Sequence, residues 1–159
     1  MAASKSTRRV IAALRAHGVD VEVRDMPGST RTARDAADAV GCDVAQIVKS
    51  LVFASEDGRA WLVLASGPNR VDPDLLQERA GSRLTMADPA TVRDATGFAI
   101  GGVAPVGLAH EMPVLIDEDL LDHDTVWAAA GTPKSVFPID PDVLRRISGA
   151  EVVRVVGAA

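Results

Sequence analysis

Two apolar runs joined by a polar turn constrain the fold of this chain more than any other feature. Residues 46–53 read Gln-Ile-Val-Lys-Ser-Leu-Val-Phe, and residues 61–65 read Trp-Leu-Val-Leu-Ala. The segment between them contains Asp57-Gly58, a dipeptide typical of hairpin turns. Both runs are short and contain β-branched or aromatic residues, which favours strands. The sequence therefore predicts an antiparallel β-hairpin.

Lys49 places a charge in the middle of the first run. Side chains alternate along a strand, so this lysine shares one face with Ile47, Leu51 and Phe53. A buried ammonium is costly unless it is paired or lines a cavity. One interpretation is an edge-strand or snorkelling lysine. The other is a functional cation, and the hairpin partner makes this interpretation more attractive because it favours a central strand position.

Aspartate followed by proline occurs three times at positions that predict the start of a helix. An aspartate N-cap before a proline in the first turn is a favourable combination, and a glycine follows each pair at a typical helix end. The predicted helices span residues 73–80, 89–96 and 141–148. Two further helices are predicted at residues 6–17 and from Thr32 to Gly41.

The remaining apolar segments predict short strands between these helices. They lie at residues 19–24, 83–87, 113–117, 125–130, 135–139 and 151–156. Helices and strands intermix without regular alternation, which predicts an α+β fold. We expect a mixed, partly closed β-sheet or barrel with helices around it. The length of 159 residues, without repeat or linker, predicts a single domain, 1–159, with its core at about 32–156.

The net charge of −5 argues against a protein that coats nucleic acid without specificity. Basic residues nevertheless concentrate near the start of the chain, at Lys5, Arg8, Arg9 and Arg15. They form either a solvated helix face or a local basic surface. No apolar run is long enough to span a bilayer, and no apolar signal-peptide core follows Met1, so we expect a cytoplasmic protein without membrane contact.

Metal and cofactor binding are not expected from the sequence. Cys42 is the only cysteine, and His17, His110 and His123 lie far apart without a metal-ligand spacing. The chain also lacks the glycine patterns of dinucleotide-binding and phosphate-binding loops. His110 is a general base by residue type, although a surface histidine is the commoner outcome.

Residues 98–107 form a second unusual segment, because three glycines and a proline interrupt an otherwise apolar run. Such a segment is either a tight bend between strands or a turn whose N–H groups face an anion or a developing oxyanion. Residues 130–135 are likewise either a hairpin turn or a wall of a pocket. Asp140 is first an N-cap and second a carboxylate partner for Lys49.

Together these motifs resemble the YbaK/ProX-like family, which includes the editing insertion domain of bacterial prolyl-tRNA synthetases. The resemblance extends from about Thr32 to the C-terminus. It depends on the order and spacing of several motifs: residues 46–53, Gly67, Arg70-Val71-Asp72, Gly97, Gly101-Gly102-x-x-Pro105-x-Gly107 and Ala130-Gly131.

The resemblance implies an aminoacyl-tRNA deacylase. Family members hydrolyse the ester between a wrong amino acid and the 3′ end of a tRNA, often alanine or cysteine on a proline tRNA. Free-standing members act in trans. Water attacks with help from the hydroxyl or thiol of the substrate, so no covalent nucleophile, metal or cofactor is implied. The implied partners are a mischarged tRNA and a prolyl-tRNA synthetase or another translation factor.

The resemblance also implies roles for individual residues. Lys49 would be a cation that positions the substrate, beside backbone N–H groups that stabilise the oxyanion. The residues implied in catalysis are Lys49, Gly101 and Gly102. Those implied in substrate binding are Pro105, Gly131, Ser135 and Asp140.

Two alternatives to an editing enzyme remain open at this stage. One is a non-catalytic module of the same fold that binds aminoacyl groups or other small ligands. The other is a hydrolase of small esters without a tRNA role. Within the family, residues near 23–32 and around 131–139 are expected to separate substrate specificities, because they line the pocket for the amino acid.

Overall fold

The computed structural model describes residues 4–26 and 32–157. Its α-helices are α1 (Lys5–Ala16), α2 (Ala33–Val40), α3 (Pro73–Ala80), α4 (Pro89–Thr96) and α5 (Pro141–Ser148). Short 3₁₀ helices occupy η1 (Val44–Gln46) and η2 (Glu118–Asp122). The strands are β1 (Arg24–Asp25), β2 (Val48–Ala54), β3 (Ala60–Ser66), β4 (Thr85–Met86), β5 (Val114–Asp117), β6 (Val126–Ala129), β7 (Ser135–Ile139) and β8 (Glu151–Val153).

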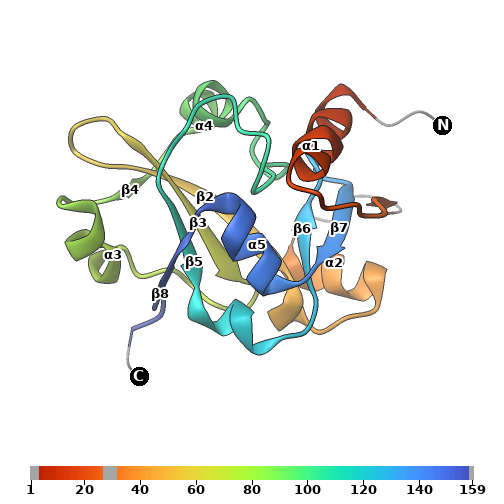
Figure 1. The fold of residues 1–159 in the computed structure, drawn as a ribbon. Helices are drawn as coiled ribbons and strands as arrows, with labels where there is room; N and C mark the ends of the chain where they lie inside the picture. Colours follow the sequence, from red (N-terminus) through yellow and green to blue (C-terminus); the bar gives the residue numbers. More distant parts are fainter. Residues whose placement is uncertain (1–3, 27–31, 158–159) are drawn as a thin grey trace.

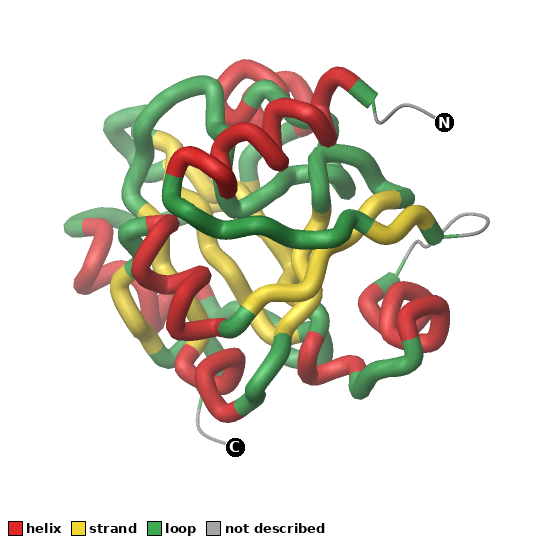
Figure 2. Tube along the Cα trace, turned by 45° about the vertical axis from the view of Figure 1, so that its right-hand side comes forward, coloured by secondary structure: helices red, strands yellow, loops and turns green. Residues whose placement is uncertain are grey.

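The strands form two sheets, with helices arranged around them (Figures 1 and 2). The larger sheet has the order β4-β2-β3-β5-β8, and the smaller has the order β1-β7-β6. β2 and β3 are the predicted antiparallel hairpin, with Lys49 opposite Ala65. The two sheets meet where Ile47 forms a parallel bridge with Trp127. The α+β prediction is confirmed, and neither sheet is closed into a barrel.

The three Asp-Pro helices begin and end where the sequence predicts. In each one the aspartate carboxylate accepts a backbone N–H of the first turn, and proline is the first helical residue. Each helix ends at a glycine in the left-handed region, where other residues would be strained. Thr32 caps α2 in the predicted manner, since its hydroxyl accepts from the N–H of Asp35 at 3.1 Å. Local capping chemistry therefore determines these boundaries.

The predicted strand at residues 19–24 is largely wrong. Val19, Val21 and Val23 do pack against the main core, as their alternation suggests. Only Arg24 and Asp25 pair with a neighbouring strand, β7. An alternating pattern identifies the face that is buried, but a strand also needs a partner backbone.

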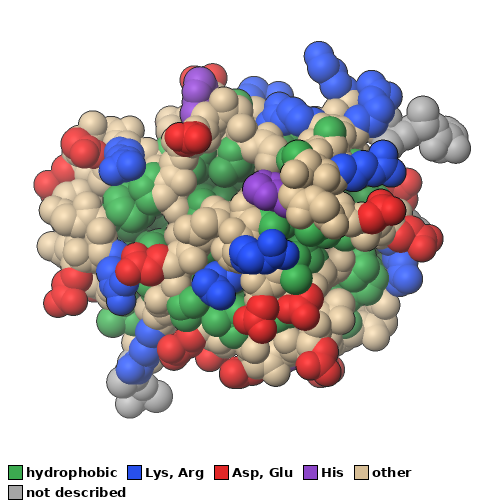
Figure 3. All heavy atoms as spheres, viewed as in Figure 1, with side chains coloured by type: hydrophobic (Ala, Val, Ile, Leu, Met, Phe, Trp, Pro, Cys, Tyr) green, Lys and Arg blue, Asp and Glu red, His purple; other side chains and the backbone are tan. Residues whose placement is uncertain are grey.

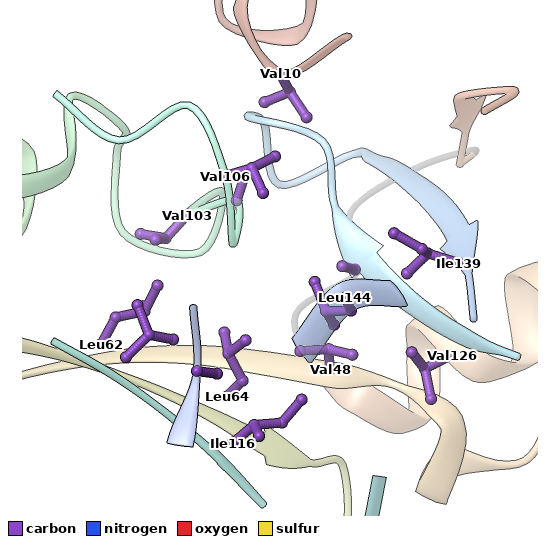
Figure 4. Close-up of a cluster of buried hydrophobic side chains, with 14 of the residues drawn as sticks. Val10, Val48, Leu62, Leu64, Val103, Val106, Ile116, Val126, Ile139 and Leu144 are labelled. Carbon is purple, nitrogen blue, oxygen red and sulfur yellow. The ribbon is translucent and has the colours of Figure 1, made fainter. Parts of the chain in front are cut away.

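The main hydrophobic core lies between the two sheets and is covered by α1 and α5. Figure 4 shows the buried side chains converging from these elements, with Val10 from α1, Leu64 from β3 and Leu144 from α5. A second cluster, which includes Phe53 and Leu76, covers the opposite face of the larger sheet. β2 separates these clusters, because its side chains alternate between them.

The alternation of β2 places Lys49 on the face of the second cluster, with Leu51 and Phe53, as predicted. Ile47 lies just before β2 and packs in a third cluster, which contains Met26 and Val136.

In the described ranges, no helix combines the length and apolar character needed to cross a bilayer.

Candidate functional site

A cavity of about 320 Å³ opens along the edge of β2. Four consecutive residues of the strand, 48–51, line it, so both faces of the strand contribute. This edge is accessible because β4 pairs with β2 only at Phe53 and Ala54. At Lys49, β2 therefore pairs with β3 on one side and borders the cavity on the other. The Lys49 side chain is half-buried rather than fully buried.

The other walls of the cavity come from segments far apart in the sequence. They are the start of α2, the loop at 100–103, and β6, β7 and their connecting turn. Most of the lining is apolar, with small residues at Ala33, Ala36 and Ala129. Among the described residues that line the cavity, none is a histidine, a cysteine or a carboxylate. It therefore offers a small apolar space with one ammonium and a few hydroxyls.

Lys49 is held at the margin of this cavity by a backbone carbonyl. Its Nζ donates to the Asn69 carbonyl oxygen at 2.5 Å. Burial lowers the pKa of Lys49, and the negative charge of Asp117 acts in the opposite direction. An ammonium has three N–H donors, so Lys49 can bind Asn69 and a ligand at the same time.

Asp117 organises the turn that presents Asn69 to the lysine. This buried carboxylate at the end of β5 accepts from the Ser66 N–H at 3.0 Å and from the Asn69 side-chain amide at 2.8 Å. It also accepts from the Asp119 N–H at 3.0 Å. The sequence analysis missed Asn69 and Asp117. An aspartate at the end of the apolar run 113–117 was the available signal, because a buried carboxylate needs partners.

Ser50 was also missed. Ser50 is one of the residues that line the cavity, but its hydroxyl oxygen is buried. This oxygen has no hydrogen-bond partner within the described part of the chain. An unsatisfied buried hydroxyl costs about 1–3 kcal/mol. A serine inside an apolar strand next to Lys49 was the signal that could have identified it.

Residues 98–107, the glycine loop, border the cavity, and Gly101 and Gly102 have different roles in it. Gly101 lines the cavity and has a φ of +87°. The Gly102 N–H donates to the Ala99 carbonyl at 3.0 Å, so this geometry does not support it as an oxyanion donor. A Cβ at Gly102 would lie 2.8 Å from the Thr132 Cα. Gly102 instead allows the loop to pack against the turn between β6 and β7.

Two of the predicted binding residues lie here, Gly131 in the turn and Ser135 at the start of β7. Gly131 has a φ of +93°, and a Cβ there would lie 2.9 Å from the backbone carbon of Ser6 in α1. Ser135 is buried and lines the cavity, with its hydroxyl 2.7 Å from the Thr132 hydroxyl. Gly131 thus packs against α1 and does not line the cavity, whereas Ser135 is part of the cavity lining.

Two predicted binding residues lie outside the lining of this cavity. Pro105 is buried and lines a different, more open cavity of about 750 Å³, together with His110. Asp140 is exposed and caps α5, where its carboxylate accepts from the Asp142 N–H at 2.8 Å. The carboxylate that acts on Lys49 is Asp117, not Asp140.

α1 connects the glycine loop and the β6–β7 turn. Arg9 donates from Nε to the Gly107 carbonyl and from Nη2 to the Thr96 carbonyl, both at 2.7 Å. The Thr7 hydroxyl donates to the Ala130 carbonyl at 2.7 Å. One helix therefore binds two segments, 98–107 and 130–135, that contribute other residues to the lining of the cavity.

The stretch at residues 23–32, expected to influence specificity, contributes Met26 and Thr32 to the lining. Residues 27–31 lie outside the described part of the structure.

Comparisons with known proteins agree on one family. A model of the aminoacyl-tRNA editing domain matches residues 28–147. YwhH of Bacillus subtilis (strain 168) is 33% identical over 131 residues, which make up 82% of this chain and 83% of YwhH. The proline–tRNA ligase of Thermosipho melanesiensis is 32% identical over 83 residues, which are 52% of this chain and 14% of the ligase.

A solved structure shows the same similarity along almost the whole chain. It is the crystal structure of a proposed trans-editing enzyme for prolyl tRNA synthetase. The TM-score is 0.93 at 47% sequence identity, with 99% of this chain and 100% of the other covered.

Proposed function

Because the chain belongs to the aminoacyl-tRNA editing domain family, we propose that it is a hydrolase that deacylates mischarged aminoacyl-tRNA in trans. The substrate is a small amino acid, such as alanine or cysteine, esterified to a proline tRNA. A prolyl-tRNA synthetase is the proposed partner that supplies the mischarged tRNA.

The observation that carries this proposal is the small apolar cavity with Lys49 at its margin. Its volume of about 320 Å³ is large enough for the aminoacyl end of a substrate. An apolar pocket discriminates weakly among small amino acids that differ by one group. The mainly apolar lining, which has no carboxylate among the described residues, suits an uncharged amino acid such as alanine or cysteine.

The chemistry is the hydrolysis of an ester that is already reactive. A water molecule attacks the carbonyl carbon, the bond from that carbon to the ribose oxygen breaks, and the ribose oxygen gains a proton. The products are a free amino acid and an uncharged tRNA. Positioning of the ester can supply much of the rate. This role falls to Lys49, while the hydroxyl or thiol of the substrate assists the water.

The test is a panel of tRNAs that carry different amino acids. We expect the protein to deacylate proline tRNA charged with alanine or cysteine and to spare the same tRNA charged with proline. Hydrolysis no faster than the spontaneous rate for every member would refute the proposal. Hydrolysis of small esters that is not inhibited by added tRNA would indicate an esterase without a tRNA role.

A further inference from the structure

α1 concentrates positive charge in an otherwise acidic protein. It contains Lys5, Arg8, Arg9 and Arg15 and no acidic residue. Its formal charge is therefore +4, whereas the whole chain carries −5, so the rest of the protein carries −9. Figure 3 shows lysine and arginine side chains gathered over α1, in the upper right of the view.

The basic residues of α1 lie mainly on its outer side. Thr7, Val10 and Leu14 are buried against the protein, whereas Lys5 and Arg15 are exposed. Arg15 lies 3.7 Å from Asp20, but both side chains are largely exposed, and such pairs are weak and easily exchanged. A ligand can therefore reach this side without displacing the core.

This basic side begins next to the cavity. The backbone of Ser6 contacts Gly131 so closely that no Cβ would fit, and the Thr7 hydroxyl binds the Ala130 carbonyl. The same turn continues into the cavity wall and carries the exposed Lys134. From this point α1 extends for 12 residues, about 18 Å. A polyanion with one end in the cavity can therefore meet basic side chains at both ends of this helix.

We propose that the outer face of α1, defined by Lys5, Arg8 and Arg15, binds the phosphate backbone of the tRNA arm whose 3′ end enters the cavity. This inference rests on the proposed function and names the surface that holds its substrate. Contacts to phosphates are independent of sequence, so the face supplies affinity and orientation, whereas the cavity selects the amino acid. It also explains how an acidic protein can bind an acidic partner.

The test compares two variants that lose the same charge. The first combines Lys5→Gln, Arg8→Gln and Arg15→Gln. The matched control combines Arg83→Gln, Arg145→Gln and Arg146→Gln, which are exposed residues of other segments. Binding of uncharged tRNA is measured by fluorescence anisotropy over a range of salt concentrations, after circular dichroism has verified that both variants are folded.

We expect the α1 variant to bind tRNA at least tenfold more weakly at low salt. The slope of log K against log salt should fall in magnitude by about 2–3, since each lost phosphate contact removes about one unit. The control should stay within twofold of the wild type. Equal losses in both variants would overturn the inference, because net charge rather than α1 would then determine binding.

Kinetics separate this inference from the proposed function. With mischarged tRNA, the α1 variant should show a raised KM and a smaller effect on kcat. If the wild type deacylates tRNA and the α1 variant has the same KM, the inference alone fails. If the wild type binds tRNA through α1 but hydrolyses no aminoacyl ester, the proposed function alone fails.

Discussion

The Lys49 ammonium donates a hydrogen bond to the Asn69 carbonyl oxygen at 2.5 Å. The Asn69 side chain is held in turn by Asp117, at 2.8 Å. The position of the cation is thus determined by a turn after β3 and by the end of β5, not by β2 alone. This arrangement keeps a charged group at the edge of an apolar cavity, where it can position a substrate.

Replacement of Lys49 tests its role most directly. We expect Lys49→Ala to reduce kcat/KM for mischarged tRNA by about 100-fold or more, the scale of losing one group that stabilises the transition state. Lys49→Met keeps much of the side-chain volume and should be equally inactive, which separates charge from packing. Both variants should keep the circular dichroism spectrum of the wild type. Normal deacylation by either one would remove Lys49 from the site.

The protonation of Lys49 predicts opposite effects of pH on activity and stability. Burial lowers its pKa from the ordinary 10.5, so deacylation, corrected for spontaneous hydrolysis, should fall as pH rises through the lowered value. In the window between that value and 10.5, the unfolded chain holds the proton that the folded protein has released. The contribution of Lys49 to the free energy of unfolding therefore rises with pH in that window. At lower pH Lys49 is charged in both states, and the cost of partly burying the ammonium lowers the stability of the folded protein.

NMR titration of the Lys49 side chain measures this shift. Asp117→Asn should lower the lysine pKa further, because the carboxylate charge favours the ammonium. An unchanged lysine pKa in this variant would show that Asp117 acts on the turn only through hydrogen bonds.

We expect replacement of Ser50 by alanine to raise stability and to lower activity. Ser50→Ala removes a buried hydroxyl without a partner in the described structure, so the free energy of unfolding should rise, by up to about 1–3 kcal/mol. Deacylation should fall, because Ser50 belongs to the cavity wall next to Lys49. Ser55→Ala is the control, since the Ser55 hydroxyl already donates to the Arg59 carbonyl at 3.1 Å and its loss should destabilise the protein. Denaturant unfolding and deacylation rates measure both effects.

Gly102→Ala should disturb the site through packing. The added methyl group would lie 2.8 Å from the Thr132 Cα, so the loop and the turn must move apart, at a cost of about 1–3 kcal/mol. Deacylation should fall with it. Gly81→Ala is the comparison: it strains the end of α3 at a φ of +73° but has open space around the new methyl group. That variant should lose stability and keep activity, and an equal loss of activity would mean that the effect is not local.

Arg9 should stabilise the glycine loop from α1. Its guanidinium binds the carbonyls of Gly107 in the loop and of Thr96 at the end of α4, and it lies 4.3 Å from the centre of the Phe98 ring. Arg9→Lys cannot reproduce the two-pronged contact, so it should lower the melting temperature and the deacylation rate nearly as much as Arg9→Ala. Arg93→Ala, on an exposed part of α4, should change neither. Full activity of Arg9→Lys would show that charge alone is sufficient.

The sequence predicted correctly those features that depend on contacts between residues close to one another along the chain. Asp72, Asp88 and Asp140 cap their helices through N–H groups two or three residues away, so the sequence contains both partners within one turn. The hairpin of β2 and β3 is equally local, because a short turn determines its register. Lys49 was recognised because a charge in an apolar strand is visible without any structure.

The features that the sequence analysis missed depend on segments that meet only in the fold. Asn69 and Asp117 reach Lys49 from other strands and turns. Pro105 faces a different cavity, and the Gly102 N–H is used within its own turn, although both belong to the same glycine-rich segment. A motif shows which residues are near one another along the chain, but not which direction each group faces.

The sequence by itself determined the helix boundaries, the hairpin, the family resemblance and the unusual position of Lys49 as a charge in an apolar strand, because each depends on local chemistry or on motif spacing. Only the tertiary structure decided which side chains surround the lysine, that Asp140 is a cap and not its partner, and that α1 binds two segments that contribute to the cavity lining. These features arise from the packing of distant segments, whose relative positions follow from the shape of the whole core.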